Sequence, residues 1–227
     1  MNPKLQPKPE VADAPRLRRG MPLAADAASP SGVTLFSDYF DRNRQATLLA
    51  DIRAILAEAP LFTPRMPRSD KPFSVRMSNC GSQGWLSDVT GYRYVARHPD
   101  TGRAWPPIPG ILLALWRDVA AASPPPEACL INYYTPAAKM GLHQDRDEAD
   151  FTAPVVSVSL GDSCLFRVGG LKRNHPTCSC RLNSGDVVVI GGAARLAFHG
   201  VDRIYPNSST LLGEGGRINL TLRRVTR

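Results

Sequence analysis

Apolar residues recur at helical spacing in two segments of the first half of the chain, at 42–58 and at about 109–122. The apolar positions are Leu48, Ile52, Ile55 and Leu56 in the first segment and Leu112, Leu115, Trp116 and Val119 in the second. Pro60 follows the first segment and marks its end. The pattern predicts two amphipathic helices whose apolar faces pack on a core.

From about residue 129 the pattern changes to short apolar stretches rich in β-branched residues. The strands that it predicts are Cys129–Tyr134, Val155–Leu160, Cys164–Val168, Asp186–Ile190 and Ile218–Leu222. Turn residues separate them, as at 183–185, and the stretch 62–108 between the helices has extended pieces at 74–77 and 92–95. Short strands after helices predict an α+β, mainly β protein, an antiparallel sandwich or jelly roll buttressed by helices.

Length and composition favour one globular domain. The chain has 227 residues, and no apolar run approaches the roughly 20 residues that cross a bilayer. The first residues lack the continuous apolar core of a secretory signal, so we expect a cytoplasmic protein without membrane association. Residues 1–30 are rich in proline and charge without hydrophobic period, which predicts a disordered basic tail before a single domain at 31–227.

The net charge is +8, which suggests a polyanionic partner such as nucleic acid, although a merely basic protein would have the same balance. The five cysteines are an odd number and favour reduced thiols over a disulfide framework. Cys178 and Cys180 lie near His175, but their spacing is not a zinc pattern and a fourth ligand is missing.

His143-Gln-Asp145 is the strongest local signal for chemistry. In an extended segment the side chains of residues i and i+2 project to the same face, so His143 and Asp145 can reach one ion. His199 follows the strand at 186–190 and its glycine turn. Two histidines and one carboxylate form the facial triad of non-haem Fe(II), although His199 considered by itself would more often be a core histidine in a sheet.

The alternating segment 217–223 places four polar side chains on one face. These are Arg217, Asn219, Thr221 and Arg223, with Ile218, Leu220 and Leu222 on the other face. Two inward arginines would be costly unless an anion meets them, and a dicarboxylate such as 2-oxoglutarate supplies that anion. The alternative is a solvent-exposed face at a basic C-terminus.

Seven ordered motifs together resemble the AlkB family. They are Asn132-Tyr-Tyr134, Leu142-His143-Gln-Asp145-Arg-Asp147-Glu148, Pro154-Val-Val-Ser-Val-Ser-Leu160, Gly169-Gly-Leu-Lys-Arg173, Gly185-Asp-Val-Val-Val189, His199-Gly200 and Arg217-Ile-Asn-Leu-Thr-Leu-Arg223. The likeness runs from about residue 74 to the C-terminus. The region 33–73 is only loosely similar, and residues 1–30 are not covered.

The resemblance implies a double-stranded β-helix (jelly roll) core at about 125–227, with a nucleotide-recognition lid at about 62–108. It implies Fe(II) and 2-oxoglutarate, with O₂ as the second cosubstrate. The implied metal ligands are His143, Asp145 and His199. The implied 2-oxoglutarate contacts are Asn132, Tyr134, Arg217, Asn219 and Arg223.

For function, the resemblance implies oxidative demethylation of N1-methyladenine and N3-methylcytosine in DNA, preferably single-stranded, with release of formaldehyde, succinate and CO₂. The implied base contacts are Met77, Trp85, Tyr92, Asp147 and Arg173. Trp85 would stack on the base opposite His143, and the Asp147 carboxylate would favour cationic lesions, which gives it a catalytic role in selecting the substrate. Without the resemblance, Trp85 and Tyr92 would be read as ordinary packing. Lys139, Gln144 and Arg146 are candidates for phosphate or base-edge contacts.

The chain departs from the family pattern at Tyr133, at His175 and in its basic tail, none of which touches the implied metal or cosubstrate residues. A demethylase or hydroxylase of RNA or tRNA with the same chemistry is an alternative that the sequence does not separate. A jelly-roll module that binds metal without catalysis is another. We expect a monomer, because no apolar dimer face is evident.

Overall fold

A computed structural model describes residues 20–22, 31–120 and 123–227, in which two antiparallel sheets, a small hairpin and two α-helices carry the fold. The helices are α1 (Arg42–Glu58) and α2 (Gly110–Val119), with a short 3-10 turn η1 (Gly192–Ala194). The strands of the first part are β1 (Met21–Pro22), β2 (Val33–Phe36), β3 (Arg76–Gly81), β4 (Gly84–Asp88) and β5 (Gly91–Val95). The later strands are β6 (Ala128–Tyr134), β7 (Met140–His143), β8 (Val155–Gly161), β9 (Ser163–Gly169), β10 (Thr177–Leu182), β11 (Val187–Ile190), β12 (His199–Tyr205) and β13 (Arg217–Arg223).

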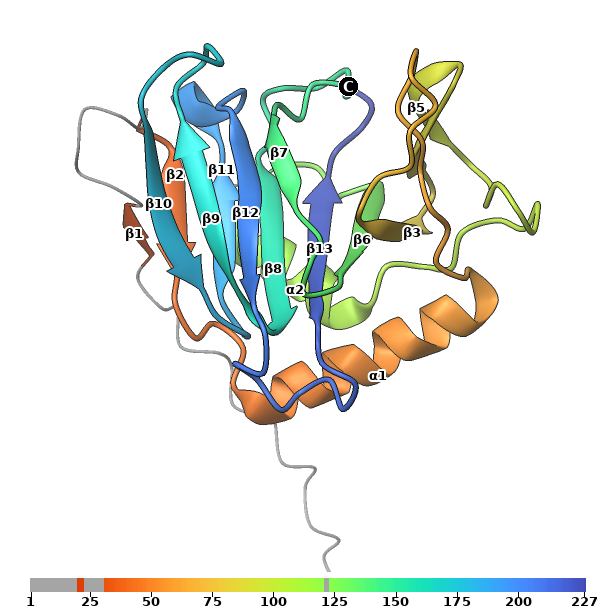
Figure 1. Ribbon diagram of the computed structural model, residues 1–227, viewed down its shortest axis with the longest axis horizontal. Coiled ribbons are helices and arrows are strands. Elements are labelled where there is room, and N and C mark those ends of the chain that lie inside the picture. Colours follow the sequence, from red (N-terminus) through yellow and green to blue (C-terminus); the bar gives the residue numbers. More distant parts are fainter. Residues whose placement is uncertain (1–19, 23–30, 121–122) are drawn as a thin grey trace, which may run out of the picture.

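The two main sheets face each other as in a jelly roll. The larger sheet has the order β1-β2-β11-β8-β13-β6-β3, and the smaller has β10-β9-β12-β7. Figure 1 shows the smaller sheet lying in front of the larger one, with α1 along the lower edge of the view. The predicted fold class, mainly β with buttressing helices, is confirmed.

Helices α1 and α2 cover the outer face of the larger sheet. Leu48 and Ile52 of α1 and Leu115 of α2 are fully buried in one core with Ile131 and Leu220 of the sheet. The side chain of Asp41 caps α1 by accepting a hydrogen bond from the backbone N–H of Arg44 at 2.9 Å. The predicted helix at 42–58 is confirmed, whereas α2 is shorter than predicted, and residues 121–122 lie outside the described ranges.

Strand β13 shows the alternation that the sequence predicts. Ile218, Leu220 and Leu222 enter the core beneath the helices. The four polar residues between and beside them line the space between the two sheets. The strand is central in its sheet because β6 and β8 pair with its two edges. A face that carries two arginines is thereby turned to the interior of the protein and not to solvent.

Strands from the first half of the chain enlarge the predicted core. Strand β3 lies within the segment 62–108 assigned to the lid, yet it pairs with β6 of the larger sheet, and only β4 and β5 form a separate hairpin. The extended piece predicted at 74–77 therefore overlaps only the first two residues of this sheet strand, which spans 76–81. Met21 and Pro22, within the predicted tail, pair with β2, and proline is tolerated at such an edge. Residues 1–19 and 23–30 lie outside the described residues.

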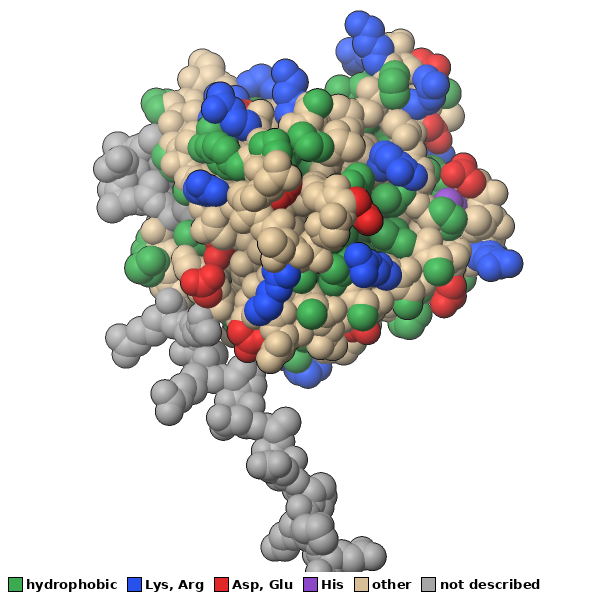
Figure 2. All heavy atoms as spheres, turned by 60° about the horizontal axis from the view of Figure 1, so that its bottom comes forward, with side chains coloured by type: hydrophobic (Ala, Val, Ile, Leu, Met, Phe, Trp, Pro, Cys, Tyr) green, Lys and Arg blue, Asp and Glu red, His purple; other side chains and the backbone are tan. Residues whose placement is uncertain are grey.

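The face of the molecule that carries α1 has mixed charge. Figure 2 shows this face, on which Lys and Arg side chains are interspersed with Asp and Glu. Within the described ranges, neither helix has the length and apolar character needed to cross a membrane. The surplus of positive charge is thus not gathered on this side of the protein.

Candidate active site

A cavity of about 680 Å³ lies between the inner faces of the two sheets and the β4–β5 hairpin. The residues that line it include all of the implied metal, cosubstrate and base contacts: Met77, Trp85, Tyr92, Asn132, Tyr134, His143, Asp145, Asp147, Arg173, His199, Arg217, Asn219 and Arg223. Of the further candidates for phosphate or base-edge contacts, Gln144 and Arg146 line the cavity and Lys139 does not. Phe73, Phe166 and Phe198, which sequence reasoning did not single out, complete the apolar part of the wall. The fold thus brings residues from distant segments into one pocket.

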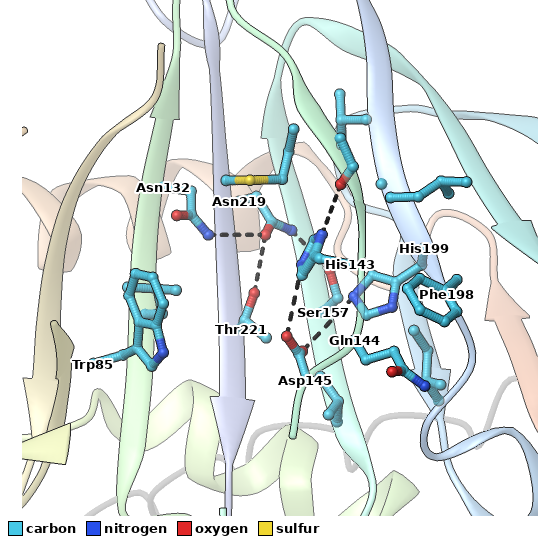
Figure 3. A pocket seen from close by; sticks show the side chains of 18 of the residues that line it. Trp85, Asn132, His143, Gln144, Asp145, Ser157, Phe198, His199, Asn219 and Thr221 are labelled. Carbon is cyan, nitrogen blue, oxygen red and sulfur yellow. Dashed lines mark hydrogen bonds and ion pairs between the residues drawn. The ribbon is translucent and has the colours of Figure 1, made fainter. Parts of the chain in front are cut away.

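His143, Asp145 and His199 form the one cluster, within the part of the chain that the structure describes, whose spacing suits a metal ion. One ligand atom of each residue lies within 4.8 Å of the others. Nε2 of His143 is 3.6 Å from Oδ1 of Asp145, and Nε2 of His199 is 3.7 Å from Oδ2. Figure 3 shows the two imidazoles turned toward the carboxylate. This donor set fits non-haem Fe(II) with coordination positions to spare.

Hydrogen bonds at the far ring nitrogen orient both imidazoles. Nδ1 of His143 lies 2.9 Å from the carbonyl oxygen of Gly141, and Nδ1 of His199 lies 3.0 Å from that of Ala197. Because a carbonyl only accepts, each Nδ1 carries the proton and each Nε2 keeps a lone pair for a metal. Burial lowers the pKa of His199 to about 4, with His143 acting in the same direction. His199 is therefore neutral near pH 7, as a ligand must be.

Gly200 lets the strand that begins at His199 approach β7 closely. A Cβ at Gly200 would lie 2.6 Å from the carbonyl oxygen of Met140, which is too close for any other residue. The register of β12 against β7 pairs His199 with His143 and then shifts before Val201. The close approach places the two imidazoles side by side, with ring centroids 4.6 Å apart.

The Asp145 carboxylate is buried and only partly satisfied. Nη2 of Arg223 lies 2.8 Å from Oδ1, whereas Oδ2 has no hydrogen-bond partner among the described residues. Burial alone would raise the pKa of Asp145, but the positive charge of Arg223 is the main effect that holds it well below its usual range. An ionised carboxylate with an orphaned buried oxygen fits a cation between it and the two histidines.

Arg217 is a buried cation without an acidic partner in the described part of the chain. The residue is 1% exposed, and its guanidinium donates to the Ser159 hydroxyl at 2.7 Å and to the Asp162 backbone carbonyl at 3.4 Å. Its Nε has no partner. A buried guanidinium whose acceptors are all neutral favours the binding of an anion. A carboxylate matches the geometry of its paired N–H donors.

A row of polar side chains crosses the cavity floor beside the metal cluster. Asn219 donates to the Ser157 hydroxyl at 2.7 Å and accepts from Thr221 at 3.0 Å and from Asn132 at 3.5 Å (Figure 3). Oδ1 of Asn132 and Nε of Arg223 are buried without partners in the described residues. The floor therefore has spare donors and acceptors for a small carboxylic acid, such as 2-oxoglutarate, that also reaches the metal.

A buried network of Glu148, Tyr94 and Arg195 lies behind Asp145. Arg195 donates to Glu148 at 3.1 Å and to the backbone carbonyl of Asp145 at 2.7 Å. Tyr94 donates to Glu148 and accepts from Arg223 at 3.1 Å. Burial raises the pKa of Tyr94, so its hydroxyl stays protonated. Sequence reasoning gave these three residues no role, because the partners of Glu148 are 54 and 47 residues away and leave no local pattern.

We expect Glu148→Ala to lower the free energy of unfolding by about 3 kcal/mol, because it leaves the buried Arg195 without its acidic partner and removes one of the two that Arg223 has. Chemical denaturation monitored by circular dichroism measures the effect. Glu214→Ala, at an exposed loop position, is the matched control and should be close to wild type. A Glu148→Ala protein as stable as the control would contradict a structural role for the network.

The lid side of the cavity joins an aromatic pair to a carboxylate. The rings of Trp85 and Tyr92 are stacked, with centroids 5.6 Å apart and planes inclined by 18°. The indole N–H of Trp85 donates to Oδ2 of Asp147 at 2.8 Å. Figure 3 shows Trp85 on the opposite side of the pocket from Phe198, with the His143 and Asp145 side chains between them. One side of the pocket thus carries a flat aromatic surface and a negative charge together.

Two further predicted contacts are engaged within the protein. Arg173 donates to the carbonyl oxygen of Leu142 at 2.7 Å, and its guanidinium lies over the Phe198 ring, 4.9 Å from the centroid. The amide of Gln144, a candidate for phosphate or base-edge contact, donates to the carbonyl oxygen of Leu196 at 2.6 Å. Both side chains shape the pocket wall near His143 in this structure.

The cysteines lie apart from this metal cluster. None of the five forms a disulfide. Cys178 and Cys180 belong to no group with metal-ligand spacing in the described ranges, and burial raises the pKa of Cys180 to about 12. The structure therefore gives no support to a zinc site at these two cysteines.

Known proteins resemble the chain over most of its length. A family model described as the 2OG-Fe(II) oxygenase superfamily matches residues 32–223. The alpha-ketoglutarate-dependent dioxygenase AlkB homolog of Caulobacter vibrioides (strain NA1000 / CB15N) is 53% identical over 194 residues, which are 86% of this chain and 88% of that protein. The alpha-ketoglutarate-dependent dioxygenase AlkB of Escherichia coli (strain K12) is 41% identical over 190 residues, 82% of this chain and 87% of that protein.

Two further similarities differ in extent. The solved structure described as "The structure of OsALKBH1" has a TM-score of 0.74 and 31% identity, and the match covers 85% of this chain and 96% of that one. The tRNA demethylase abh1 of Schizosaccharomyces pombe (strain 972 / ATCC 24843) is 41% identical over 83 residues, 37% of this chain and 28% of that protein. The structural match supports the fold over most of the described chain.

Proposed function

The chain belongs to the AlkB family of the 2OG-Fe(II) oxygenase superfamily, and we propose that it oxidatively demethylates N1-methyladenine and N3-methylcytosine in single-stranded DNA. It is an Fe(II)- and 2-oxoglutarate-dependent dioxygenase. The observation that carries the proposal is one pocket that combines a two-histidine, one-carboxylate cluster, a buried arginine without an acidic partner, and an aromatic wall bearing a carboxylate. The cluster suits a metal, the arginine suits a dicarboxylate, and the aromatic wall with its carboxylate suits a methylated cationic base.

The residues of the floor and wall have distinct proposed roles. His143, Asp145 and His199 hold Fe(II) through Nε2, a carboxylate oxygen and Nε2, and Arg217 binds a carboxylate of 2-oxoglutarate. The remaining cosubstrate contacts are Asn132, Tyr134, Asn219 and Arg223. Bound iron, 2-oxoglutarate and O₂ together supply the oxidant for a methyl C–H bond, after which the hydroxymethyl product releases formaldehyde.

The lid wall is proposed to hold the damaged base. A base within a duplex is stacked and paired, so the enzyme must flip it out or act on a single strand. Trp85 offers a stacking surface, which is typically worth about 1–3 kcal/mol per base. Met77 and Tyr92 also line the cavity, and Arg173 lines it from the side of Phe198. N1-methyladenine and N3-methylcytosine are cationic near neutral pH, and the Asp147 carboxylate attracts that charge.

Mass spectrometry of a methylated single-stranded oligonucleotide tests the proposal. We expect methyl loss and succinate formation that require both Fe(II) and 2-oxoglutarate, and neither product with His143→Ala. Consumption of 2-oxoglutarate without methyl loss would mean that the reaction class is right and the substrate wrong. Oligonucleotide binding without any turnover would instead favour a non-catalytic module.

We expect Asp147→Ala to lower kcat/KM for cationic lesions by roughly tenfold while Fe(II) binding is retained, because the charge that attracts the base is lost and the metal ligands remain. Kinetics with N1-methyladenine and with the neutral base N1-methylguanine measure it. Asp51→Ala on α1 is the control. Equal losses on both bases would count against electrostatic selection.

An RNA or tRNA substrate is the second candidate, and the similarity to a tRNA demethylase favours testing it. Both kinds of enzyme read a flipped methylated base, so the pocket does not separate them. Methylated DNA and RNA oligonucleotides of the same sequence, compared in one assay, do so. A strong preference for RNA would contradict the DNA proposal.

We further propose a monomeric enzyme of the cytoplasm. The five cysteines form no disulfide, even though Cys80 lies directly opposite Cys129 across two paired strands, and this suits a reducing compartment. Light scattering after size-exclusion chromatography tests the oligomeric state. A mass twice that of the 24.7 kDa chain would contradict the monomer.

A further inference from the structure

The hydrogen bond between Trp85 and Asp147 joins two parts of the pocket that are 62 residues apart in the chain. Trp85 belongs to β4 of the lid hairpin, whereas Asp147 lies in the segment that follows β7 and carries the metal ligand Asp145. The indole N–H faces an anionic acceptor at 2.8 Å, which makes this a charge-assisted hydrogen bond. Such bonds are stronger and more directional than neutral ones.

The indole end of this bond is rigidly supported. The buried Asn79 of β3 accepts from the backbone N–H of Trp85 at 3.0 Å and donates to its carbonyl oxygen at 3.1 Å. Tyr92 stacks on one face of the indole, and Phe73 contacts it edge-on at 6.4 Å between centroids. Neighbours on several sides therefore fix the direction in which the N–H points.

The carboxylate end stands between two anchored acidic residues. Asp145 is held by Arg223, and Glu148 is held by Arg195. Asp147 itself is exposed at the cavity, and within residues 31–120 and 123–227 it accepts a side-chain hydrogen bond from Trp85 alone. One oxygen of Asp147 is thereby positioned by the indole, and the other remains able to accept from the amino group of a base.

The same bond changes the electronic character of the stacking surface. An anion that accepts from an indole N–H pushes electron density into the ring, and an electron-rich ring attracts a cation over its face more strongly. A methylated adenine or cytosine cation would thus meet two linked attractions, the ring beneath it and the carboxylate at its edge. A neutral methylated base would gain little from either.

We propose that the Trp85 N–H, through Asp147, is a determinant of selectivity for cationic over neutral methylated bases, distinct from the stacking surface that the ring provides. Trp85 is in this respect a positioning residue. The inference rests on the proposed base demethylation and deepens it. Its specific consequence is that an aromatic replacement without the N–H should keep stacking and lose discrimination.

An NMR measurement tests the bond itself. The chain has three tryptophans, and the indole N–H groups of Trp105 and Trp116 donate to backbone carbonyls, which makes them internal references. In ¹⁵N-labelled full-length protein loaded with Zn(II) and 2-oxoglutarate, Trp85→Phe identifies the Trp85 signal by its disappearance. We expect Asp147→Asn to move that signal upfield and to leave the two references in place. An unmoved Trp85 signal would overturn the proposal.

Kinetics test the selectivity. The readout is the ratio of kcat/KM for N1-methyladenine to that for N1-methylguanine in the same single-stranded oligonucleotide. We expect Trp85→Phe to lower this ratio by about tenfold, as loss of a hydrogen bond to a charged group does. Trp105→Phe, a matched replacement elsewhere in the lid, should leave the ratio unchanged.

The double variant Trp85→Phe/Asp147→Asn shows whether Trp85 and Asp147 affect selectivity together or independently of each other. Its ratio should equal that of Asp147→Asn, because the indole acts through the carboxylate. A ratio lowered by the product of the two single effects, or an equal loss on both bases in Trp85→Phe, would overturn the proposal. If the wild-type protein demethylates neither base, the proposed function fails, and the NMR result decides whether the bond exists.

Discussion

Asp145→Ala should abolish turnover, with a loss of at least about 10³-fold in kcat. The substitution removes the one carboxylate of the metal cluster and leaves two neutral imidazoles, which bind Fe(II) weakly and fix no geometry. It also leaves Arg223 in the cavity with Glu148 as its remaining acidic neighbour. Succinate formation and methyl loss, measured together, report the activity, and dialysis against Fe(II) reports the metal.

Asp147→Ala is the matched control, because it removes a carboxylate two residues away that is no part of the cluster. That variant should bind Fe(II) like the wild type, whereas Asp145→Ala should not. Turnover in Asp145→Ala that remains within tenfold of wild type would contradict its assignment as a ligand.

Arg217→Met should raise the Kd for 2-oxoglutarate at least about 100-fold, because a buried arginine met by neutral groups alone is replaced by an apolar side chain. The unliganded variant should be no less stable than wild type, since a buried charge without an acidic partner is costly and its removal relieves that cost. Calorimetric titration with Mn(II) in place of Fe(II) measures the affinity, and thermal unfolding without cosubstrate measures the stability.

A loss of affinity for 2-oxoglutarate without a loss of stability would indicate that Arg217 serves ligand binding and not folding. Arg203→Met, at an exposed position of β12, is the control and should change neither quantity. A strongly destabilised Arg217→Met protein with unaltered affinity would show instead that Arg217 is structural and that the anion binds elsewhere.

Local periodicity and spacing predicted much of this site. The alternation at 217–223 placed two arginines on one face, and β13 confirms it, because side-chain direction in a strand follows from the pleat alone. The i, i+2 spacing of His143 and Asp145 is local in the same way. Helix α1 was predicted at about 42–58 and spans Arg42–Glu58, since its apolar positions and Pro60 are contained in one short segment.

Partner choice across the chain could not be predicted in this way. The pairing of Arg223 with Asp145, the network around Glu148 and the bond from Trp85 to Asp147 each join residues that are distant in sequence. Strand β3 was assigned to the lid because nothing in its own residues shows that β6 offers it a free edge. Such contacts exist only once both sheets have formed and their edges and interior are filled.

The sequence by itself therefore predicted which side chains line the pocket and which way most of them face, because side-chain direction in a strand or helix follows from the local repeat. Only the tertiary structure decided which charged side chains have a partner of opposite charge or a hydrogen-bond donor beside them. Among the described residues, Asp145 pairs with an arginine and keeps one oxygen without a partner, Arg217 has no acidic partner, and Asp147 accepts from an indole. Burial and distance between remote segments set these differences, on which the proposed roles of a metal ligand, an anion site and a base-selecting carboxylate rest.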